Sequence, residues 1–148
     1  MSTEDNKALA RRYFEGVNQG NLAYLDEVCA PDVVLHFPGL PEPVRGLAGL
    51  RQVFTVYVTA LPDMHQTVED LVAEGNRVAV RWRARGTQTG PLAGPMGSVP
   101  ATGRPATVTG INLLRIEAGK IVEDAGEFDA LGMLQQLGAL PAPAQAQA

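Results

Sequence analysis

Hydrophobic positions in the first part of the chain recur at the spacing of a helix. In the segment STEDNKALARRYFEGVNQG, Leu9, Tyr13 and Val17 are four residues apart, so they share one helical face. Ser2 or Thr3 can cap the start of this helix, and acidic residues follow in its first turn. The pattern therefore predicts that the chain begins with an amphipathic helix.

Two more helices and a strand are predicted before residue 65. The segment NLAYLDEVC is typical of a short helix capped by Asn21, and DVVLHFPG of a strand that stops at Pro38. The segment GLAGLRQVFTVYVTALPD predicts a third helix that ends before Pro62. Its apolar stripe consists of Leu50, Phe54, Val58 and Leu61.

The second half of the chain changes to strand-like alternation. Four β-rich runs, HQTVEDLVAEG, RVAVRWRARGTQ, PATVTGINLLRI and KIVEDAGEF, are separated by Gly, Pro and Asn. They predict consecutive antiparallel strands. A last helix is expected after a cap at Asp129, with Leu131, Leu134 and Leu137 as its apolar positions and Gly138 just beyond.

Helices followed by a strand meander favour the α+β class, with a curved antiparallel sheet wrapped on the N-terminal helices. Residues 1–140 are expected to form a single domain, and the tail at 141–148, PAPAQAQA, to be disordered because it has nothing to bury. The segment 88–105, QTGPLAGPMGSVPATGRP, is too rich in Gly and Pro for a buried element. It is either a lid over a functional site or a flexible crossing.

Alternation along the strands predicts which side chains face the helices. In the strand from residue 77 to 85, the even positions are apolar and include Trp82, while the odd positions carry four arginines. On the apolar face of the next strand, Asn112 is the polar exception. On the last strand, Asp124 shares a face with Gly126 and Phe128, so its carboxyl is the exception there.

The turn between the last two strands sets which of these residues meet. A three-residue loop, Glu117 to Gly119, with its glycine in the left-handed conformation would place Asn112 directly opposite Asp124. Burial would raise the pKa of Asp124 and suit its carboxyl to proton abstraction, although hydrogen bonds from Asn112 would oppose that rise. The alternative is a structural Asp–Asn hydrogen bond in the core.

The remaining acids and imidazoles have simpler interpretations. Glu123 and Glu127 share the face of the arginine row, where cross-strand ion pairs are expected. His36 and His65 are the only histidines; each is either a general acid or oxyanion donor, or a structural group.

The single Cys29 is expected to be a small buried residue. No metal site is expected, because no ligand spacing is present.

Charge and composition restrict the class of partner. The net charge of −4 and the pI near 5.1 argue against nucleic-acid binding, which needs clustered Lys and Arg. No apolar run is long enough to span a bilayer, and the polar N-terminus does not resemble a signal peptide. We therefore expect a cytoplasmic protein with a small or neutral partner and no membrane partner.

Several blocks of the chain resemble the SnoaL-like polyketide cyclases of the nuclear transport factor 2-like superfamily. They are NKALARRYFEGVNQGNLAYLDEVCAPDVVLHFPG, ALPDMHQTVEDLVAEGNRVAVRWRARGTQTG, PATGRP and GINLLRIEAGKIVEDAGEFDALGMLQQLG. The resemblance implies a cone-shaped α+β barrel, a homodimer or homotetramer formed through the outer face of the sheet, and no metal or organic cofactor. Cyclases of this family are understood to use a pocket aspartate that removes an acidic C–H proton, so that the resulting enolate closes a ring by aldol addition.

The chain departs from the family pattern at two positions. The aspartate of the family falls on Gly126, and a pocket histidine of the family falls on Asn112. Asp124, one step along the same inward face, is the available replacement base, which would shift the carboxyl by roughly 6 to 7 Å. Gly126 itself is either a bend in the curved sheet or space for a ligand.

The resulting hypothesis is a cofactor-free cyclase, or a related lyase or isomerase, that acts on a small hydrophobic metabolite containing a carbonyl group, with antibiotic biosynthesis as its setting. The candidate catalytic residues are Asp124 as acid/base and Asn112, His65 and His36 as hydrogen-bond donors. The candidate pocket residues are Trp82, Phe54, Tyr57, Phe128, Gly126, Met96 and Leu114. Epoxide hydrolase or dehydratase chemistry, with Glu69 or Asp70 as a second carboxylate, and non-catalytic ligand binding are the alternatives.

Overall fold

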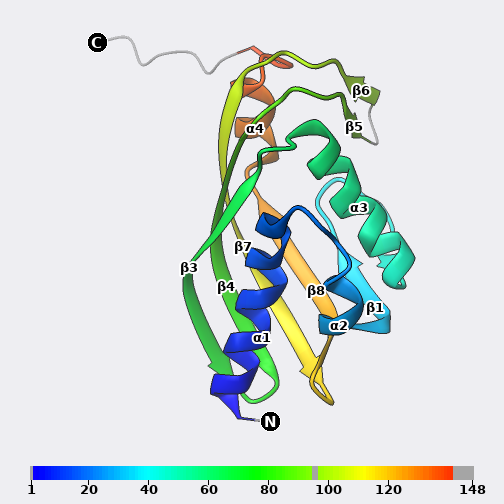
Figure 1. The fold of residues 1–148 in the computed structure, drawn as a ribbon, viewed down its shortest axis with the longest axis vertical. Helices are drawn as coiled ribbons and strands as arrows, with labels where there is room; N and C mark the ends of the chain where they lie inside the picture. The colour runs from blue at the N-terminus through cyan, green and yellow to red at the C-terminus, as the bar shows by residue number, and fades with distance from the viewer. Residues whose placement is uncertain (1, 95–96, 142–148) are drawn as a thin grey trace.

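The protein is described by a computed structural model that covers residues 2–94 and 97–141 (Figure 1). The helical elements are α1 (Thr3–Glu15), the 3₁₀ helix η1 (Gly16–Gln19), α2 (Leu25–Val28), α3 (Leu47–Ala60) and α4 (Ala130–Gln136). The strands are β1 (Cys29–His36), β2 (Val44–Arg45), β3 (His65–Glu74), β4 (Arg77–Thr87), β5 (Leu92–Gly94), β6 (Gly97–Val99), β7 (Pro105–Glu117) and β8 (Lys120–Phe128). The predicted pocket residue Met96 and most of the predicted tail lie outside the described residues.

The predicted N-terminal helix is confirmed, together with its cap. The Ser2 hydroxyl accepts a hydrogen bond from the backbone N–H of Asp5, whose carboxylate accepts one from the N–H of Ser2, so both ends of a capping box are present. The second helix is shorter than predicted. Asn21 does not cap it, because its side chain accepts from the N–H of Ala23 and forms a local turn, and α2 begins only at Leu25.

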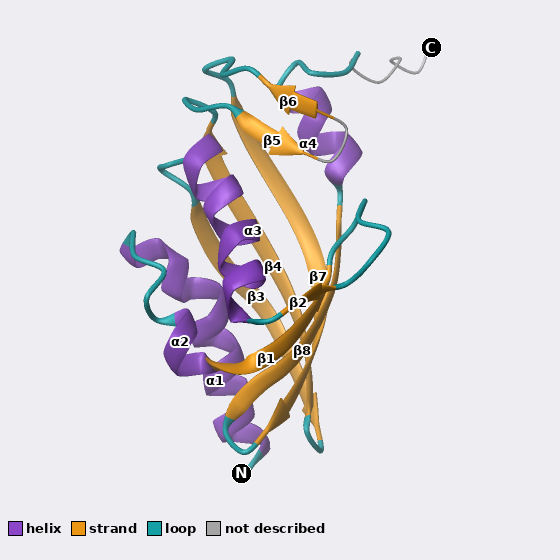
Figure 2. Ribbon diagram, turned by 90° about the vertical axis from the view of Figure 1, so that its right-hand side faces the viewer, coloured by secondary structure: helices purple, strands orange, loops and turns teal. Residues whose placement is uncertain are grey.

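The main sheet has six strands in the order β2-β1-β8-β7-β4-β3. All neighbouring pairs are antiparallel except β1 and β8, which run parallel. The edge strands β2 and β3 do not pair with each other, so the sheet curves without closing into a barrel. Figure 2 shows α1, α2 and α3 together on one side of this curved sheet. The α+β architecture is therefore confirmed.

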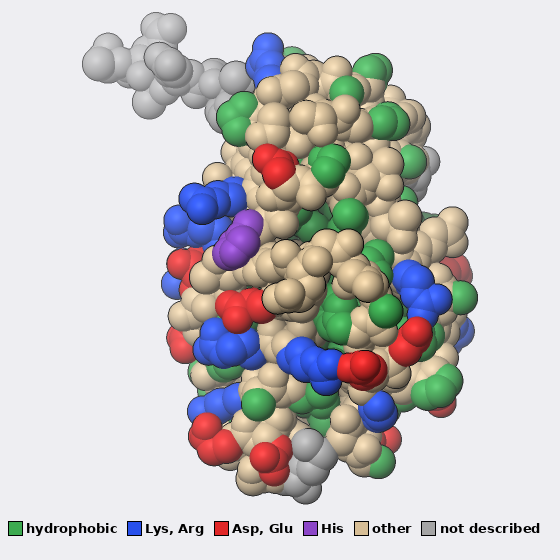
Figure 3. All heavy atoms as spheres, viewed as in Figure 1, with side chains coloured by type: hydrophobic (Ala, Val, Ile, Leu, Met, Phe, Trp, Pro, Cys, Tyr) green, Lys and Arg blue, Asp and Glu red, His purple; other side chains and the backbone are tan. Residues whose placement is uncertain are grey.

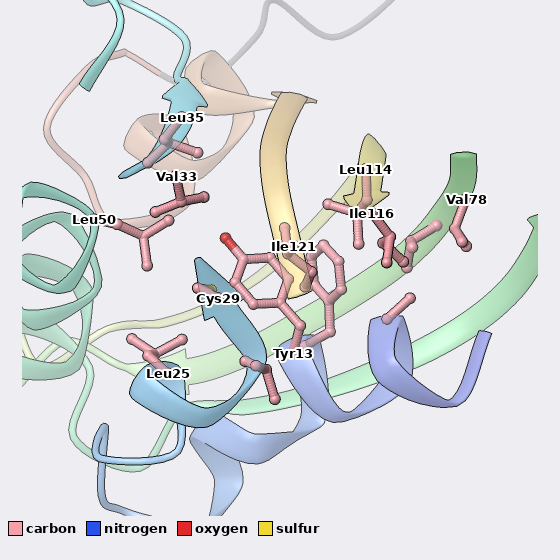
Figure 4. Close-up of a cluster of buried hydrophobic side chains, with 14 of the residues drawn as sticks. Tyr13, Leu25, Cys29, Val33, Leu35, Leu50, Val78, Leu114, Ile116 and Ile121 are labelled. Carbon is pink, nitrogen blue, oxygen red and sulfur yellow. The ribbon is translucent and has the colours of Figure 1, made fainter. Parts of the chain in front are cut away.

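The predicted inward faces of the long strands are confirmed except at the start of β8, where Ile121 is fully buried although strict alternation places it on the face opposite to Asp124. On β4, the even positions from Val78 to Ala84 are buried, while Arg77, Arg81 and Arg83 are exposed. The buried apolar side chains of the sheet form one core with those of the helices. Figure 4 shows part of it, with Tyr13 of α1 among residues of β1, β7 and β8. The free Cys29 is buried in this core, as predicted.

The predicted pairing of the last two strands is wrong by two residues. Asn112 lies opposite Gly126, and Asp124 lies opposite Leu114. The turn is responsible in part, because it contains two residues instead of three: Glu117 pairs with Lys120, and both turn residues have positive φ. A register shift between the pairs of Arg115 and Ile116 on β7 accounts for the rest of the difference.

The last helix and the Gly/Pro-rich segment differ in part from expectation. Asp129 caps α4 by accepting a hydrogen bond from the N–H of Gly132, and Leu137 is fully buried, but Leu131 is 60% exposed. The buried face is formed instead by Met133 and Leu137, which are four residues apart. Residues 88–105 were expected to hold no buried element, yet Gln88 is fully buried and Leu92 is 4% exposed, in a segment that forms the β5–β6 hairpin.

Candidate active site

A pocket opens between the helices and the inner face of the sheet, with a free volume of about 120 Å³. Its walls are mostly apolar, and many of them are aromatic. The aromatic rings come from α1, α3, β4, β8 and the loop after β1, namely Tyr13, Phe14, Phe37, Phe54, Tyr57, Trp82 and Phe128. Several of these rings contact one another, with Phe37 and Phe128 at 5.4 Å between ring centroids. Five predicted pocket residues thus line this cavity: Trp82, Phe54, Tyr57, Phe128 and Gly126.

Asp124 is the carboxyl side chain of this pocket. It is 2% exposed and lines the cavity together with Asn112. Among the described residues that line the pocket, Asp124 is the only acidic one. Alternation along β8 places it there, because Ala125 and Glu127 on either side of Gly126 are exposed while Asp124 is buried. Ile121 is buried as well, but it lies before the register shift that precedes Glu123. The predicted inward orientation of Asp124 is therefore confirmed.

Each oxygen of the Asp124 carboxyl has a hydrogen-bond donor. The hydroxyl of Tyr13, from α1, donates to Oδ2 at 2.7 Å. The amide Nδ2 of Asn112, from β7, donates to Oδ1 at 2.7 Å. Tyr13 is fully buried, and in Figure 4 its ring projects from α1 among residues of the sheet. The carboxyl is thus fixed between the first helix and the last two long strands.

A fourth residue extends this arrangement. The indole Nε1 of Trp82 donates to Oδ1 of Asn112 at 2.8 Å, so Asn112 both accepts from Trp82 and donates to Asp124. The expected contact between Asn112 and Asp124 is therefore present, although the register that predicted it is wrong. Asn112 reaches its partner diagonally across the strand pair, two residues away from the position directly opposite.

Burial controls the acidity of these groups. Desolvation raises the pKa of Asp124 to about 6, while the hydrogen bonds from Tyr13 and Asn112 act in the opposite direction. Burial and the nearby Asp124 carboxylate raise the pKa of Tyr13 well above its usual value. Near neutral pH, Tyr13 is therefore a hydrogen-bond donor and Asp124 is a weak base that is mostly ionised.

The structure explains why glycine occupies position 126. A Cβ atom built at Gly126 would lie 2.5 Å from Nδ2 of Asn112 and 2.8 Å from its Cγ. The amide of Asn112 therefore folds over the glycine on the neighbouring strand, and this path leads it to Asp124. Gly126 was expected to be either a bend in the sheet or space for a ligand. Neither interpretation describes what it does here, because the side chain of Asn112 occupies the space beside it.

Three other predicted site residues lie elsewhere. Leu114 is fully buried in the main core and is not among the residues that line the pocket. The side chain of His36 contacts Glu123 at 3.0 Å on the outer face of the sheet, although the residue is at the pocket's edge. His65 is exposed at the start of β3 and is not a lining residue.

The candidate second carboxylates also lie outside the pocket. Glu69 is 3.4 Å from Arg83 in an ion pair on the outer face of the sheet, and the carboxylate of Asp70 accepts from the backbone N–H of Leu71. A register shift between Val68 and Asp70 separates these residues from the inward positions. The expected cross-strand ion pair of Glu123 is present, since its carboxylate lies 3.5 Å from Arg115.

Sequence reasoning missed Tyr13 as a site residue. Its position on the apolar stripe of α1 was recognised, but the stripe gives no indication that its hydroxyl meets a carboxyl 111 residues away. The available signal was a tyrosine among aliphatic positions, because a buried phenol needs a hydrogen-bond partner. Gln66 of β3 and Met64 just before it also line the pocket without having been predicted.

Within residues 2–94 and 97–141, no three His, Cys, Asp or Glu side chains are grouped as they would be to bind a metal ion. In the same part of the chain, no helix combines the length and the apolar character that crossing a membrane requires. Figure 3 shows that basic and acidic side chains are intermixed on the face that carries α1 and α3.

The chain is similar to several solved structures over nearly its whole length. TsrD from Streptomyces laurentii is 30% identical, with a TM-score of 0.81 over 95% of this chain and 99% of that one. IdmH from Streptomyces antibioticus, provisionally described as a polyketide cyclase, is 38% identical, with a TM-score of 0.76 over 90% and 98%. AclR from Streptomyces galilaeus, provisionally described as a hydroxylase, is 26% identical, with a TM-score of 0.82 over 97% and 87%.

No protein with a curated description matches the chain in sequence. The family model for SnoaL-like polyketide cyclases, in contrast, matches residues 7–137. This match includes most of α1 with Tyr13, the strands with Asn112 and Asp124, and α4. The chain therefore belongs to the SnoaL-like polyketide cyclase family.

Proposed function

We propose that the protein is a cofactor-free enzyme that closes a ring in a hydrophobic, carbonyl-containing metabolite, with Asp124 as its acid/base. The observation that carries this proposal is the buried Asp124 carboxyl, held between Tyr13 and Asn112 in an aromatic pocket. Membership of the cyclase family agrees with it. The apolar walls favour a substrate with little charge, because a charged group would lose its hydration there.

The proposed reaction begins with transfer of a proton to Asp124. The carboxylate takes a proton from a carbon next to a carbonyl group, and the electrons of the C–H bond move to the carbonyl oxygen to form an enolate. The enolate carbon then bonds to a second carbonyl carbon of the same molecule. The oxygen of that second carbonyl takes the proton back from Asp124, so the carboxylate is restored and the reaction is an internal aldol addition.

Asn112 is suited to stabilise the enolate oxygen. Its amide has two N–H groups, and one of them is directed at Asp124. The second has no acceptor among the described residues and belongs to a side chain that lines the pocket. One well-placed donor of this kind lowers a barrier by about 3 to 4 kcal/mol. His65 and His36 are less suited to the role, since the side chain of neither faces the cavity.

The first test follows proton abstraction by itself. An aromatic β-keto ester serves as the probe, and its uptake of deuterium from D₂O is followed by NMR. We expect the protein to accelerate exchange at the acidic carbon and Asp124→Asn to reduce that acceleration by roughly 10² to 10⁴. Glu127→Gln, on the same strand with its side chain exposed, is the matched control and should exchange like the wild type. Equal rates for Asp124→Asn and the wild type would remove Asp124 from the reaction.

The two alternatives predict different outcomes. Epoxide opening would require a second carboxylate beside Asp124, and Glu69 and Asp70 both lie away from the cavity among the described residues. A non-catalytic binding protein would bind the β-keto ester without accelerating exchange at any pH. Binding without exchange would therefore favour that class over a cyclase.

We also propose that the protein forms a homodimer or homotetramer through the outer face of the sheet. An apolar row crosses four neighbouring strands of that face, where Val72, Ala79, Leu113 and Ala125 are cross-strand neighbours. Val72 is 63% exposed and Leu113 is 41% exposed, and nearby Ile111 is 58% exposed. Exposed apolar rows of this kind are typical of interfaces.

A further inference from the structure

We propose that Trp82 is a positioning residue for Asp124, which it controls through Asn112. This inference deepens the proposed function, because it concerns how the same carboxyl is kept ready to accept a proton. It rests on three contacts that form a chain: Trp82 to Asn112, Asn112 to Asp124, and the close approach of Asn112 to Gly126.

This series of hydrogen bonds has a direction, because the indole N–H of Trp82 can only donate. The atom of Asn112 that faces it at 2.8 Å must therefore be the oxygen. An amide carries its oxygen and its nitrogen on the same carbon, so this choice leaves the NH₂ group toward Asp124, at 2.7 Å from Oδ1. Trp82 thus fixes which end of the Asn112 amide the carboxyl meets.

The orientation of the amide affects the charge of Asp124. An NH₂ group facing Oδ1 stabilises the ionised carboxylate and leaves no acceptor there for a proton. A proton on Asp124 is thereby restricted to Oδ2, which faces the hydroxyl of Tyr13. If Asn112 turned by half a rotation, its oxygen would face Oδ1 and would stabilise the protonated acid. Trp82 prevents this rotation because it would set an N–H against an N–H.

Packing supports the same assignment. Trp82 is 8% exposed, and its ring lies over Gly110 on β7, where a Cβ atom would be 2.4 Å from Cζ2. The indole is therefore held by close contact with β7 and cannot easily turn its N–H elsewhere. Two glycines on adjacent strands thus make room for the side chains that form these hydrogen bonds. Gly110 leaves space for the indole and Gly126 leaves space for the amide.

The other groups that act on Asp124 are few and can be controlled for. Tyr13 approaches from α1 and donates to Oδ2. From β1, His36 lowers the pKa of Asp124 by its charge, and Cys29 is close enough for its own pKa to be raised by Asp124. Trp82 itself carries no charge, so its effect on Asp124 must pass through orientation or packing.

The test is a double-mutant cycle read by carbon-13 NMR titration of the Asp124 carboxyl, which requires no substrate. Trp82→Phe removes the indole N–H, and Asn112→Leu removes the amide while keeping its approximate shape. We expect Trp82→Phe to raise the pKa of Asp124 by about 1, the equivalent of about one net hydrogen bond. In the Asn112→Leu background, the same Trp82→Phe change should leave the pKa unaltered, because the connection is already lost.

A second measurement keeps Trp82 in place. The chain has a single tryptophan, so its indole N–H gives one NMR signal. In the wild type we expect this signal to shift with the same midpoint as the Asp124 carboxyl. The shift should disappear in Asp124→Asn, which leaves His36 intact, and in Asn112→Leu.

Two results would overturn the inference. One is an unchanged pKa of Asp124 in Trp82→Phe; the other is a rise of equal size in the presence and absence of Asn112, which would show that Trp82 acts by packing alone. Neither result depends on turnover. Loss of the inference would therefore leave the proposed cyclase function to be judged by deuterium exchange, and a failed exchange experiment would leave the titration valid.

Discussion

Replacing Asp124 by Asn should make stability less dependent on pH. In the wild type, burial raises the pKa of this carboxyl from 3.8 to about 6, so the folded state holds the proton more tightly than the unfolded chain does. The contribution of Asp124 to stability is therefore greatest below pH 4 and is lost as the pH rises through about 6. An asparagine can accept from Asn112 and donate to Tyr13, so the variant keeps both hydrogen bonds without a buried charge.

The size of the effect follows from the shift in pKa. A difference of about 2 between the folded and unfolded pKa values corresponds to about 3 kcal/mol, fully expressed above pH 7. We expect Asp124→Asn to gain about this much free energy of unfolding relative to the wild type between pH 4 and pH 7.5. Other titrating groups are common to both proteins and cancel in the difference.

The assay is urea denaturation of both proteins at half-unit steps from pH 4 to pH 8, followed by circular dichroism. The quantity of interest is the difference in the free energy of unfolding at each pH. Glu127→Gln is again the control, since its exposed side chain should give a difference close to zero at every pH. A flat difference for Asp124→Asn, or a wild type that gains on the variant as the pH rises, would refute the idea that desolvation dominates this carboxyl.

Three further predictions test the surroundings of the site. Tyr13→Phe should raise the pKa of Asp124 by about 1, seen in the carboxyl titration, because it removes the donor to Oδ2; an unchanged pKa would mean that this hydrogen bond does not form. Gly126→Ala should lower the free energy of unfolding, measured by urea denaturation, by roughly 1 to 3 kcal/mol, since its Cβ would displace the Asn112 amide. An unchanged free energy of unfolding would contradict the close packing. Leu113→Glu should convert the assembly to monomers in light scattering after gel filtration, while an unchanged mass would exclude the outer face as the interface.

Much of the fold could be predicted from the sequence, because the apolar spacing of the long elements is dictated by burial. The inward side of β4, of β7 and of the second half of β8 depends only on alternation, which survives an error of register where no extra residue interrupts the strand. That is why Asp124 and Asn112 were both placed inside correctly. One extra residue, Val122, does interrupt β8, and Ile121 before it is buried against the pattern. The register itself depends on a turn and a local shift near Arg115, and neither has a clear signal in the residues.

The site was harder to predict than the fold. A contact between Tyr13 and Asp124 depends on how α1 lies across the sheet, and no local pattern contains that information. His36 shows the limit in another way. It lies on a strand with apolar residues on both faces, so alternation did not decide its direction, and the structure turns its side chain toward Glu123. Long-range packing, rather than sequence spacing, determines both outcomes.

The parallel pairing of β1 with β8 has a consequence for synthesis of the protein on the ribosome. The strand that carries Asp124 is the last of the sheet to be made, yet it takes a place between β1 and β7. Until β8 takes its place, the edges of β1 and β7 that it pairs with are unpaired. The hydroxyl of Tyr13 also lacks its acceptor, Asp124. Because Asp124 itself lies on β8, a chain that ends before this strand has neither the carboxyl nor the backbone neighbours that bury it.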